Sequence, residues 1–377
     1  MKIGVVTPWY PTEDAPISGL FVQREVEAFR DHGDDVRVVH LDRSLPAGQL
    51  RKEWQRGVRV LRLGMNPASP FSVLCSVPKL REAVRGLDVV NTHAISALPV
   101  AIAARFKQPW VHTEHWSALS SPESASLLFR LVRPLFGMLL RAPDVAVAES
   151  LRLADAIRVF RGDRPVEIVP CIVPTPPQIE PFPGAEVRDA TLKLVSTGGV
   201  IERKNPLLAV QTLAKLRDKG INASLRWVGE GNQKLEAQRL AAEMGVEAEF
   251  LGGLSPSGVE RELGAADIFF APTEGENFFV AAAEALVNGR PICASDQGGH
   301  VEYALPEYSE IVGEQDPESY AGAIVRLQEK TRGVSPERVS ASVRDRFSPA
   351  AIAELYRSLY RSLLQTDAQK RGRLTLW

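Results

Sequence analysis

The sequence contains little that would mark a disulfide scaffold, a metal centre or a membrane span. Among 377 residues there are only three cysteines, and their spacing shows no pairing. No cluster of cysteine and histidine has the spacing of a zinc site, and no apolar run approaches the length of a membrane-spanning helix. We therefore expect a soluble, cytoplasmic protein with buried, reduced thiols, at Cys75, Cys171 and Cys293.

An excess of charge of one sign is also absent. Lysine and arginine total 45, aspartate and glutamate total 46, and the formal net charge is −1. This balance gives no sign of a protein that generally binds nucleic acid or acidic membranes. Residues 225–320 carry 18 acidic and only 5 basic side chains, which argues against a groove for a nucleic-acid backbone in this half. The first six residues have the pattern of a strand and not of a signal peptide.

Short apolar strands alternate with helical patterns twice along the chain, which predicts two doubly wound α/β domains. The first is predicted at 1–172 and the second at 191–348, with a last helix at about 349–377 that packs back on the first. Between the domains we expect a linker at 173–190, with the hinge near it, because prolines too dense for a helix or a central strand begin at its edge. They are Pro170, Pro174, Pro176, Pro177, Pro181 and Pro183. The cleft between such domains is the default ligand site.

The most informative stretch, 274–291, has the order polar turn, helix, glycine and strand after an apolar strand. The first amides of such a helix have no partner within it, and with the helix dipole they form a seat for an anion. Glu276 lies at the mouth of that seat, and Glu284 lies two turns further along. Carboxylates accept hydrogen bonds from hydroxyls, so the pair suits a nucleotide-sugar. The spacing alone is a weak signal, because the dipole also favours a solvated glutamate near a helix start.

A second loop, after the first strand of the second domain, carries Gly198 and Gly199 and then Arg203 and Lys204. A turn of small residues that brings two cations to a helix start is a plausible diphosphate clamp. Surface charge beside a helix is the alternative. Cations at this end oppose the helix dipole, however, so a bound anion would account for them better.

Three further loops follow predicted strands. Gly19 has no side chain to keep a phosphate from the first helix, although an ordinary turn glycine is an equal alternative. His115 has the chemistry to bind a sugar hydroxyl, or to hydrogen-bond within its loop, whereas His93 is expected to be structural. The turn at 296–302 is predicted to add backbone amides free to bind a ligand.

Taken together, these motifs resemble the retaining GT-B glycosyltransferases of family 4, which use nucleotide-sugar donors. The resemblance covers nearly the whole chain and is strongest over 194–291. Glu276 to Glu284, with Ala285 and Gly289-x-Pro291, is similar to the family's E-x7-E motif. Gly198 with Lys204 resembles the family's G-R-L-x-x-x-K loop. Thr113-Glu114-His115 resembles its sugar-contacting loop, and Ser18-Gly19 resembles its Gly-Gly loop.

The resemblance implies a GT-B fold, in which two Rossmann-like domains face each other across a cleft. Lys204 and the amides near 278–280 would hold the diphosphate, and Glu284 the ribose hydroxyls. Glu276 and His115 would contact the donor sugar, and backbone near Leu254 the base. The predicted catalytic residues are therefore Lys204, Glu276 and His115. The predicted donor-binding set adds Gly19, Gly198, Gly199, Arg203, Leu254, Asn277, Phe278, Phe279, Val280 and Glu284.

The resemblance also implies that no metal or other cofactor is needed. The sequence contains no Asp-x-Asp, the metal-bridging motif of the other main transferase fold. Gly199 stands where the family has arginine, and Asn277 and Phe279 stand where it has glycine. Pro170-Cys171-Ile172 replaces the family's Pro-Asn-Gly. These departures bear on the identity of the donor, for which a UDP-sugar is favoured and a GDP-sugar comes next.

The expected function is retaining transfer of a hexosyl-type sugar to a hydroxyl acceptor, in the synthesis of a glycan, glycolipid or small-molecule glycoside. Alternatives are a nucleotide-sugar 2-epimerase of the same fold and a non-catalytic nucleotide-sugar-binding protein. On a predicted helix at 124–141, Arg130, Arg133 and Arg141 alternate with apolar residues. This pattern allows peripheral contact with the inner face of a membrane, although a core helix with arginines that reach solvent is the preferred interpretation.

Overall fold

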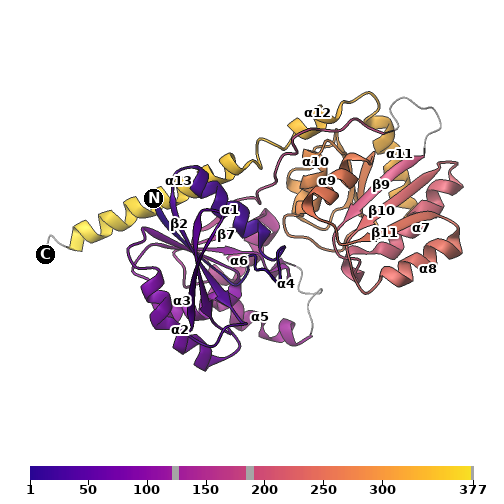
Figure 1. The fold of residues 1–377 in the computed structure, drawn as a ribbon. Helices are drawn as coiled ribbons and strands as arrows, with labels where there is room; N and C mark the ends of the chain where they lie inside the picture. The colour runs from indigo at the N-terminus through magenta and orange to yellow at the C-terminus, as the bar shows by residue number, and fades with distance from the viewer. Residues whose placement is uncertain (121–126, 184–190, 375–377) are drawn as a thin grey trace. The chain divides into compact units, whose positions relative to one another are not determined.

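The computed structural model describes residues 1–120, 127–183 and 191–374. The chain divides into two compact units, which we treat separately (Figure 1). Unit 1 comprises Met1–Ile172 and Pro349–Trp377, and unit 2 comprises Val173–Ser348. Of the predicted linker, residues 173–183 have no regular secondary structure, and 184–190 lie outside the described residues.

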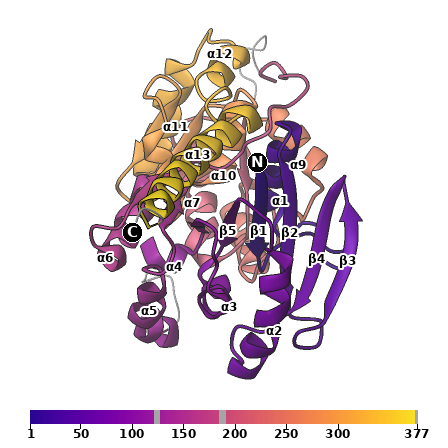
Figure 2. The same cartoon turned by 90° about the vertical axis from the view of Figure 1, so that its left-hand side faces the viewer.

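Unit 1 is built on an eight-stranded sheet with the strand order β3-β4-β2-β1-β5-β6-β7-β8. All neighbouring strands are parallel except β3, which pairs antiparallel with β4 at one edge (Figure 2). The strands are β1 (Lys2–Thr7), β2 (Asp35–Asp42), β3 (Leu50–Gln55), β4 (Val58–Gly64), β5 (Val89–His93), β6 (Trp110–Glu114), β7 (Val145–Ala148) and β8 (Val166–Ile168). The central strands are buried along their length, as parallel strands covered on both faces must be.

The helices of unit 1 include the C-terminal helix of the chain. They are α1 (Leu20–Asp31), α2 (Pro70–Ala83), α3 (Leu98–Ala104), α4 (Ser117–Ser120), α5 (Leu127–Leu139), α6 (Leu151–Arg161) and α13 (Pro349–Leu374). Helix α13 packs on α1 through buried aromatic rings, with the Tyr356 ring edge-on to Phe29 at 5.5 Å between centroids. Its hydroxyls also reach the sheet, since Asn91 donates to Tyr360 Oη at 3.1 Å. The last helix therefore completes the core of unit 1.

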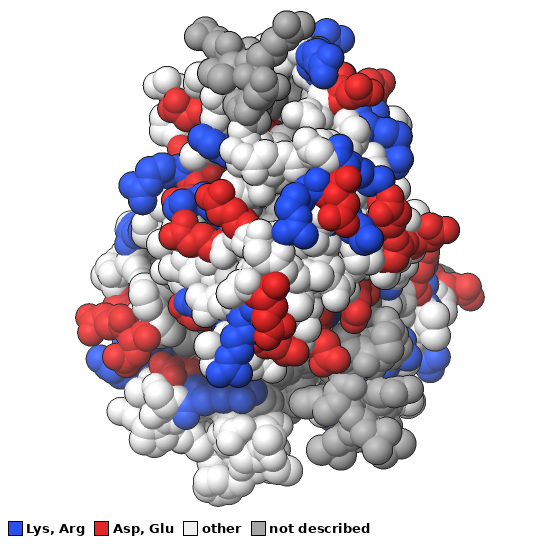
Figure 3. Space-filling view, turned by 90° about the vertical axis from the view of Figure 1, so that its right-hand side faces the viewer, with Lys and Arg blue, Asp and Glu red and all other residues white. Residues whose placement is uncertain are grey.

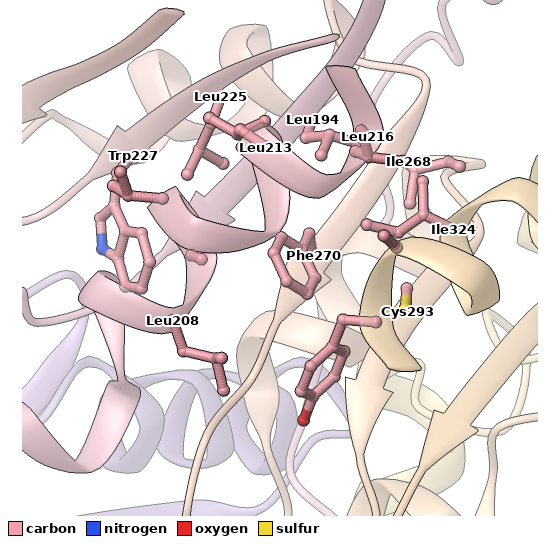
Figure 4. Packing of buried hydrophobic residues seen from close by; sticks show 14 of the residues in the cluster. Leu194, Leu208, Leu213, Leu216, Leu225, Trp227, Ile268, Phe270, Cys293 and Ile324 are labelled. Carbon is pink, nitrogen blue, oxygen red and sulfur yellow. The ribbon is translucent and has the colours of Figure 1, made fainter. Parts of the chain in front are cut away.

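Unit 2 contains a six-stranded, fully parallel sheet with the order β11-β10-β9-β12-β13-β14. Its strands are β9 (Leu192–Thr197), β10 (Ala223–Val228), β11 (Glu247–Gly252), β12 (Ile268–Ala271), β13 (Ile292–Ser295) and β14 (Ser309–Val312). Its helices are α7 (Pro206–Asp218), α8 (Lys234–Met244), α9 (Pro256–Gly264), α10 (Val280–Val287), α11 (Pro317–Lys330) and α12 (Pro336–Ala341). Phe270 of β12 and Cys293 of β13 pack with Leu213 of α7 and Ile324 of α11 in its core (Figure 4).

Some elements escaped the sequence patterns. Strand β3 is an antiparallel edge strand in which no residue is fully buried and the three charged residues are consecutive, and α2 carries an internal proline, Pro78. Helix α6 was also missed, although Ser150 caps it by accepting a hydrogen bond from the amide of Leu153. Of the helix predicted at 124–141, Leu127–Leu139 is observed as α5, and 124–126 lie outside the described residues.

The surface carries charges of both signs. On the face drawn in Figure 3, acidic and basic side chains lie next to each other. In the molecule as a whole, ion pairs join neighbouring strands and helices, as between Arg226 and both Glu249 and Glu262. No helix among the described residues is both long and apolar enough to cross a membrane.

Candidate functional site

In unit 2, three loops meet at the carboxyl ends of the adjacent strands β9, β12 and β13. The loop after β12 donates the Glu274 amide to the carbonyl of Arg203, at 2.8 Å, in the loop after β9. It also donates the Glu276 amide to the carbonyl of Gln297, at 2.9 Å, in the loop after β13. Because β12 lies between β9 and β13 in the sheet, these loops are neighbours by topology. Ligands of open parallel sheets bind at this edge.

The centre of this edge is the carboxylate of Glu276. One oxygen, Oε1, accepts from Lys204 Nζ at 2.5 Å and from Arg203 Nη1 at 2.7 Å. Thr273 Oγ1 lies 3.1 Å from both this oxygen and the Arg203 carbonyl. The Lys204 and Glu276 side chains are only 11% and 13% exposed. One carboxylate therefore holds two cations from the loop between β9 and α7. The set of two cations and one carboxylate retains one net positive charge.

Burial and charge shift the pKa values of this pair. Burial raises the pKa of Glu276, but the positive charges of Lys204 and Arg203 outweigh it, and the net shift is downward. Burial also lowers the pKa of the Lys204 amine, and the attraction of Glu276 offsets this only in part. We take Lys204 as protonated and Glu276 as ionised in the resting protein, since the amine nitrogen and the carboxylate oxygen are in direct hydrogen-bond contact.

The backbone conformation at Gly198, and not the space beside the lysine, favours glycine there. A Cβ at Gly198 would lie 3.4–3.5 Å from Cε and Nζ of Lys204, and its φ of +125° is one that side chains rarely adopt. The Lys204 ammonium lies 4.6 Å from the centroid of the Phe279 ring, within the range of a cation–π contact. Gly199, next in the chain, is half-buried, and a Cβ there would make only ordinary contacts, with Glu230 and Ile201.

Phe279 precedes α10 in a left-handed conformation, with φ 66° and ψ 64°. This conformation costs a residue with a Cβ about 1–2 kcal/mol, which is the physical reason glycine suits the position. Burial of the ring offsets the cost, because it packs edge-on against Phe269 and His300. The hydroxyl of Tyr303 lies 2.7 Å from the Phe279 carbonyl and holds the turn. The ring therefore belongs to the interior of unit 2.

The first turn of α10 faces the same cluster. The amide of Ala282 donates to the Phe279 carbonyl, at 3.1 Å, but the amides of 278–281 have no acceptor among the residues that the structure describes. Because Lys204 lies over the Phe279 ring, its ammonium is next to this turn. A cation and unpaired amides together suit an anion.

The other predicted residues of unit 2 are placed differently. Glu284 is half-buried on α10, and Asn277 is buried, with its carbonyl accepting from the Gly299 amide at 2.6 Å. Leu254 is half-buried in the loop between β11 and α9, where its Cβ lies close to Gly258. No recorded contact joins Leu254 to the Lys204–Glu276 cluster within the described part of the chain.

The prediction of free amides in the turn at 296–302 is wrong for its first residues. The Gln297 amide donates to Ser295 Oγ, the Gly298 amide to the Asp296 carbonyl, and the Gly299 amide to the Asn277 carbonyl. The first two of these bonds close the turn itself, and the third joins it to the loop after β12. The turn also places the His300 ring in the interior of unit 2. There Nε2 of His300 donates to the Ser295 carbonyl at 2.6 Å.

Gly19 and His115 belong to unit 1. A Cβ at Gly19, whose φ is +73°, would lie 2.4 Å from the backbone of Trp9, so close packing of the chain already requires glycine there. His115 is not restricted to its own loop. Its Nδ1 hydrogen-bonds to Glu149 Oε1, and its Nε2 lies 3.1 Å from Nδ1 of His93. Both nitrogens of the predicted sugar-binding ring thus have partners in this structure.

Sequence reasoning missed several residues of these two sites. Glu149 directly follows β7, and a polar residue just after a buried strand was an available signal. Thr273 and His300 gave no signal, because only the three-dimensional arrangement of the loops shows what they contact. Within the described ranges, no three histidine, cysteine, aspartate or glutamate side chains are grouped so as to hold a metal ion.

Two family models match the chain, one to each half. "Glycosyltransferase Family 4" matches residues 19–175, and "Glycosyl transferases group 1" matches residues 191–330. The chain belongs to the family 4 glycosyltransferases. The match over 191–330 contains the whole Lys204–Glu276 cluster of this glycosyltransferase.

Curated relatives are similar over part of their length. A 2-deoxystreptamine glucosyltransferase of Streptomyces kanamyceticus is 27% identical over 261 residues, which cover 63% of this chain and 66% of that protein. A GDP-mannose-dependent phosphatidylinositol dimannoside mannosyltransferase of Mycobacterium tuberculosis is 31% identical, over 35% of this chain and 34% of that protein.

Solved structures match the glycosyltransferase over nearly its full length. Sucrose-phosphate synthase from Thermosynechococcus elongatus superposes with a TM-score of 0.74 at 21% identity, covering 97% of this chain and 100% of that one. An Anabaena protein in complex with UDP and glucose has a TM-score of 0.71 at 17% identity, covering 96% and 100%. The predicted GT-B fold is confirmed.

Removal of the Glu276 charge should destabilise unit 2 in a pH-dependent way. In Glu276→Gln, Lys204 and Arg203 lose their anion, and we expect the free energy of unfolding at pH 7 to fall by about 3 kcal/mol. Since the folded-state pKa of Glu276 is lowered, its contribution is complete above the ordinary value of 4.5 and disappears as the pH falls through the lowered value.

Urea denaturation from pH 7 to pH 3 measures this difference. Glu274→Gln removes the same charge from an exposed position in the same loop and serves as the control. A Glu276→Gln effect that is independent of pH, or that Glu274→Gln reproduces, would contradict the assignment.

Proposed function

We propose that this glycosyltransferase moves a hexosyl-type sugar from a nucleotide-diphosphate sugar to a hydroxyl acceptor, with retention of anomeric configuration. The observation that carries the proposal is the Lys204–Arg203–Glu276 cluster beside the unpaired amides of α10. Its net positive charge and its amides suit a diphosphate, and its carboxylate suits the hydroxyls of a sugar.

Transfer requires the anomeric carbon to lose the diphosphate while positive charge develops on the sugar ring. Lys204 and the amides of 278–280 would stabilise the departing diphosphate, which gains charge in the transition state. In the resting protein Glu276 holds the Lys204 ammonium in place over the Phe279 ring. The ammonium is therefore oriented before the donor arrives, which spares the cost of ordering it during the reaction.

The roles of Glu276 and Glu284 in this proposal are to bind hydroxyls. A retaining glycosidase places two carboxyl groups on either side of the anomeric carbon as acid and nucleophile. Glu276 already accepts two cations and a hydroxyl through one oxygen, so it is a poor nucleophile. We assign the second oxygen to the donor sugar and Glu284 to the ribose. The reaction needs no metal in this account, because the cluster supplies the positive charge.

A UDP-sugar is the favoured donor, and a GDP-sugar comes next. Support for UDP comes from the Anabaena structure in complex with UDP and glucose, which matches 96% of this chain. Support for GDP comes from the GDP-mannose-dependent Mycobacterium relative, which matches 35% of this chain. The acceptor stays open among glycans, glycolipids and small-molecule glycosides.

The proposed location is the cytoplasm, with peripheral membrane contact only if the acceptor is a lipid. On α5, Leu135 and Met138 are exposed. Arg133, however, donates to the Leu119 carbonyl at 2.9 Å and lies over the Phe160 ring at 5.2 Å. These contacts support a packing role for this arginine. The Arg130 side chain lies outside the described residues.

A thermal-shift panel of UDP-, GDP-, ADP- and TDP-sugars tests the proposed function. We expect UDP-sugars to raise the Tm most, by about 5 °C at roughly 100 times the Kd. A panel without any shift contradicts donor binding. A donor that is turned over to its epimer without an acceptor points to an epimerase, and binding without nucleotide release against many acceptors points to a non-catalytic protein.

Lys204→Ala should lower kcat/KM for transfer by at least about 100-fold, because it removes the cation next to the departing diphosphate. Glu276 keeps its bond to Arg203, so the fold should survive. Nucleotide release is the measurement. Lys215→Ala, which removes an exposed lysine of α7, is the control and should leave turnover unchanged. Near-normal activity in Lys204→Ala would rule out the clamp.

Glu284→Ala should weaken binding of the nucleoside diphosphate by about tenfold or more, since a carboxylate that accepts from ribose hydroxyls is lost. Calorimetric titration with UDP and GDP gives the two Kd values. Glu274→Ala removes an exposed carboxylate from the loop before α10 and controls for the change in net charge. Equal Kd values for Glu284→Ala and wild type would sink the ribose assignment.

A further inference from the structure

A row of buried titratable side chains crosses unit 1 from α1 to the segment that follows β8. Its members come from five segments that the topology brings to the carboxyl edge of one sheet. Each of these residues is at least largely buried, and the four ionisable side chains of glutamate and histidine are at most 12% exposed. In order, the row is Glu25, His93, His115, Glu149 and Cys171.

Consecutive members of the row are in contact. Glu149 Oε1 accepts from Nδ1 of His115, and the Glu149 carboxylate lies near enough to the Cys171 thiol to add to the rise in its pKa that burial causes. On the other side, Nε2 of His115 lies 3.1 Å from Nδ1 of His93, and the planes of the two rings are nearly parallel, 11° apart. Nε2 of His93 lies 3.7 Å from Oε2 of Glu25, longer than a hydrogen bond.

The last pair is the unusual one. Oε2 of Glu25 and Nε2 of His93 are both fully buried, and neither has a hydrogen-bond partner among the described residues. Unpaired buried polar atoms are costly and rare. These two atoms lie 3.7 Å apart, so a small rotation of either side chain would bring them into one hydrogen bond. That bond would give both atoms a partner.

Counting hydrogens restricts what the row can do. From Glu25 to Glu149 there are three links, and each takes one proton if Glu149 stays a carboxylate. In one arrangement Glu25 is a neutral acid and both rings are neutral. In the other, Glu25 is a carboxylate and His115 is an imidazolium that donates to both Glu149 and His93. The second arises from the first when Glu25 gives its proton to His93 Nε2 and His93 gives its Nδ1 proton to His115 Nε2.

We propose that Glu149 is a positioning residue that fixes the ring of His115, and that Glu25 and His93 store the proton that charges this ring. The exchange is internally balanced: Glu25 loses one proton, His115 gains one, and His93 changes only its tautomer. His115 thus changes its charge without a proton from solvent. The functional part of this proposal rests on the proposed function and on the role that the family resemblance implies for His115, a contact with the donor sugar.

The charges around the row favour both arrangements. Burial raises the pKa of Glu25 to about 8, so this acid holds a proton at neutral pH. Burial opposes a charged His115, but the carboxylates of Glu149, Glu25 and Glu114 outweigh it and raise the pKa of His115. Burial and the neighbouring rings of His115 and His112 keep the pKa of His93 well below its usual value, so His93 transmits a proton and does not retain it.

Other groups that face the row have settled partners. On β6, His112 Nε2 bonds to Glu114 Oε2 at 3.0 Å, and Glu114 Oε1 accepts from the amides of His115 and Trp116. From α13, Tyr356 bonds to Thr113 and Tyr360 to Asn91, and burial raises the pKa of both hydroxyls. The charge of Arg24, on α1, reaches Cys171 and slightly opposes the rise in its pKa.

Nitrogen-15 NMR of the full chain, labelled at its six histidines, tests the row without any substrate. In the wild type we expect His115 to keep its Nδ1–H in both charge states and to titrate above an ordinary histidine. In Glu149→Gln the imidazolium loses its carboxylate partner, so the titration midpoint of His115 should fall by about one pH unit or more. Glu149→Asp should retain most of the shift and covers the case in which Glu149→Gln does not fold.

Glu27→Gln is the matched control for Glu25→Gln, because Glu27 is on the same helix but pairs with Arg56 outside the row. Glu25→Gln should change the tautomer signals of His93, and Glu27→Gln should leave them as in wild type. The same midpoint for His115 in wild type and Glu149→Gln, or unchanged His93 signals in Glu25→Gln, overturns the row.

The pH profile of transfer then tests positioning. The part of the rate–pH curve that depends on ionisation of His115 should shift in Glu149→Gln by the same number of pH units as the NMR midpoint. Glu149→Asp should restore the wild-type curve. An NMR shift without a shift of the profile overturns the positioning role. If the wild type transfers no sugar from any donor, the proposed function fails, and the NMR titration alone decides on the proton row.

Discussion

The candidate donor site depends on one carboxylate oxygen that is shared by two cations. Glu276 Oε1 holds Lys204 and Arg203, and it does so at the point where the loops after three neighbouring strands are joined through their backbones. A lysine ammonium buried to this degree needs a counter-charge, since desolvation alone is unfavourable. Glu276 supplies it, and in doing so fixes the ammonium beside the first turn of α10. Two residues with positive φ, Gly198 and Phe279, lie next to this ammonium.

Much of the fold follows from sequence pattern. Alternating apolar strands and helical segments predicted α/β units, because parallel strands require crossover helices. The same order of loops predicted that Arg203, Lys204 and Glu276 share an edge, and the structure brings them together. Strand β3 and helix α2 were not predicted, since an antiparallel edge strand has a weak pattern and Pro78 interrupts a helical one. Here tertiary packing decides the local structure.

The details of the site were less predictable. From the sequence Phe279 is only a large residue where glycine is usual, and its burial against Phe269 and His300 depends on contacts distant in the chain. Likewise, His115 looks like a free strand-end histidine until its two nitrogens are seen to face Glu149 and His93. Amides in the turn at 296–302 were expected to be free, but folding of that turn onto its neighbour uses them. In each case the missing information is which side chains meet.

The most direct measurement is an experimental structure of the protein bound to UDP or GDP. The account predicts that the diphosphate lies within hydrogen-bond distance of Lys204 Nζ and of the amides of 278–280, with the ribose hydroxyls on Glu284. A diphosphate bound elsewhere, with the Lys204–Glu276 pair unchanged and apart from the ligand, would contradict the central claim.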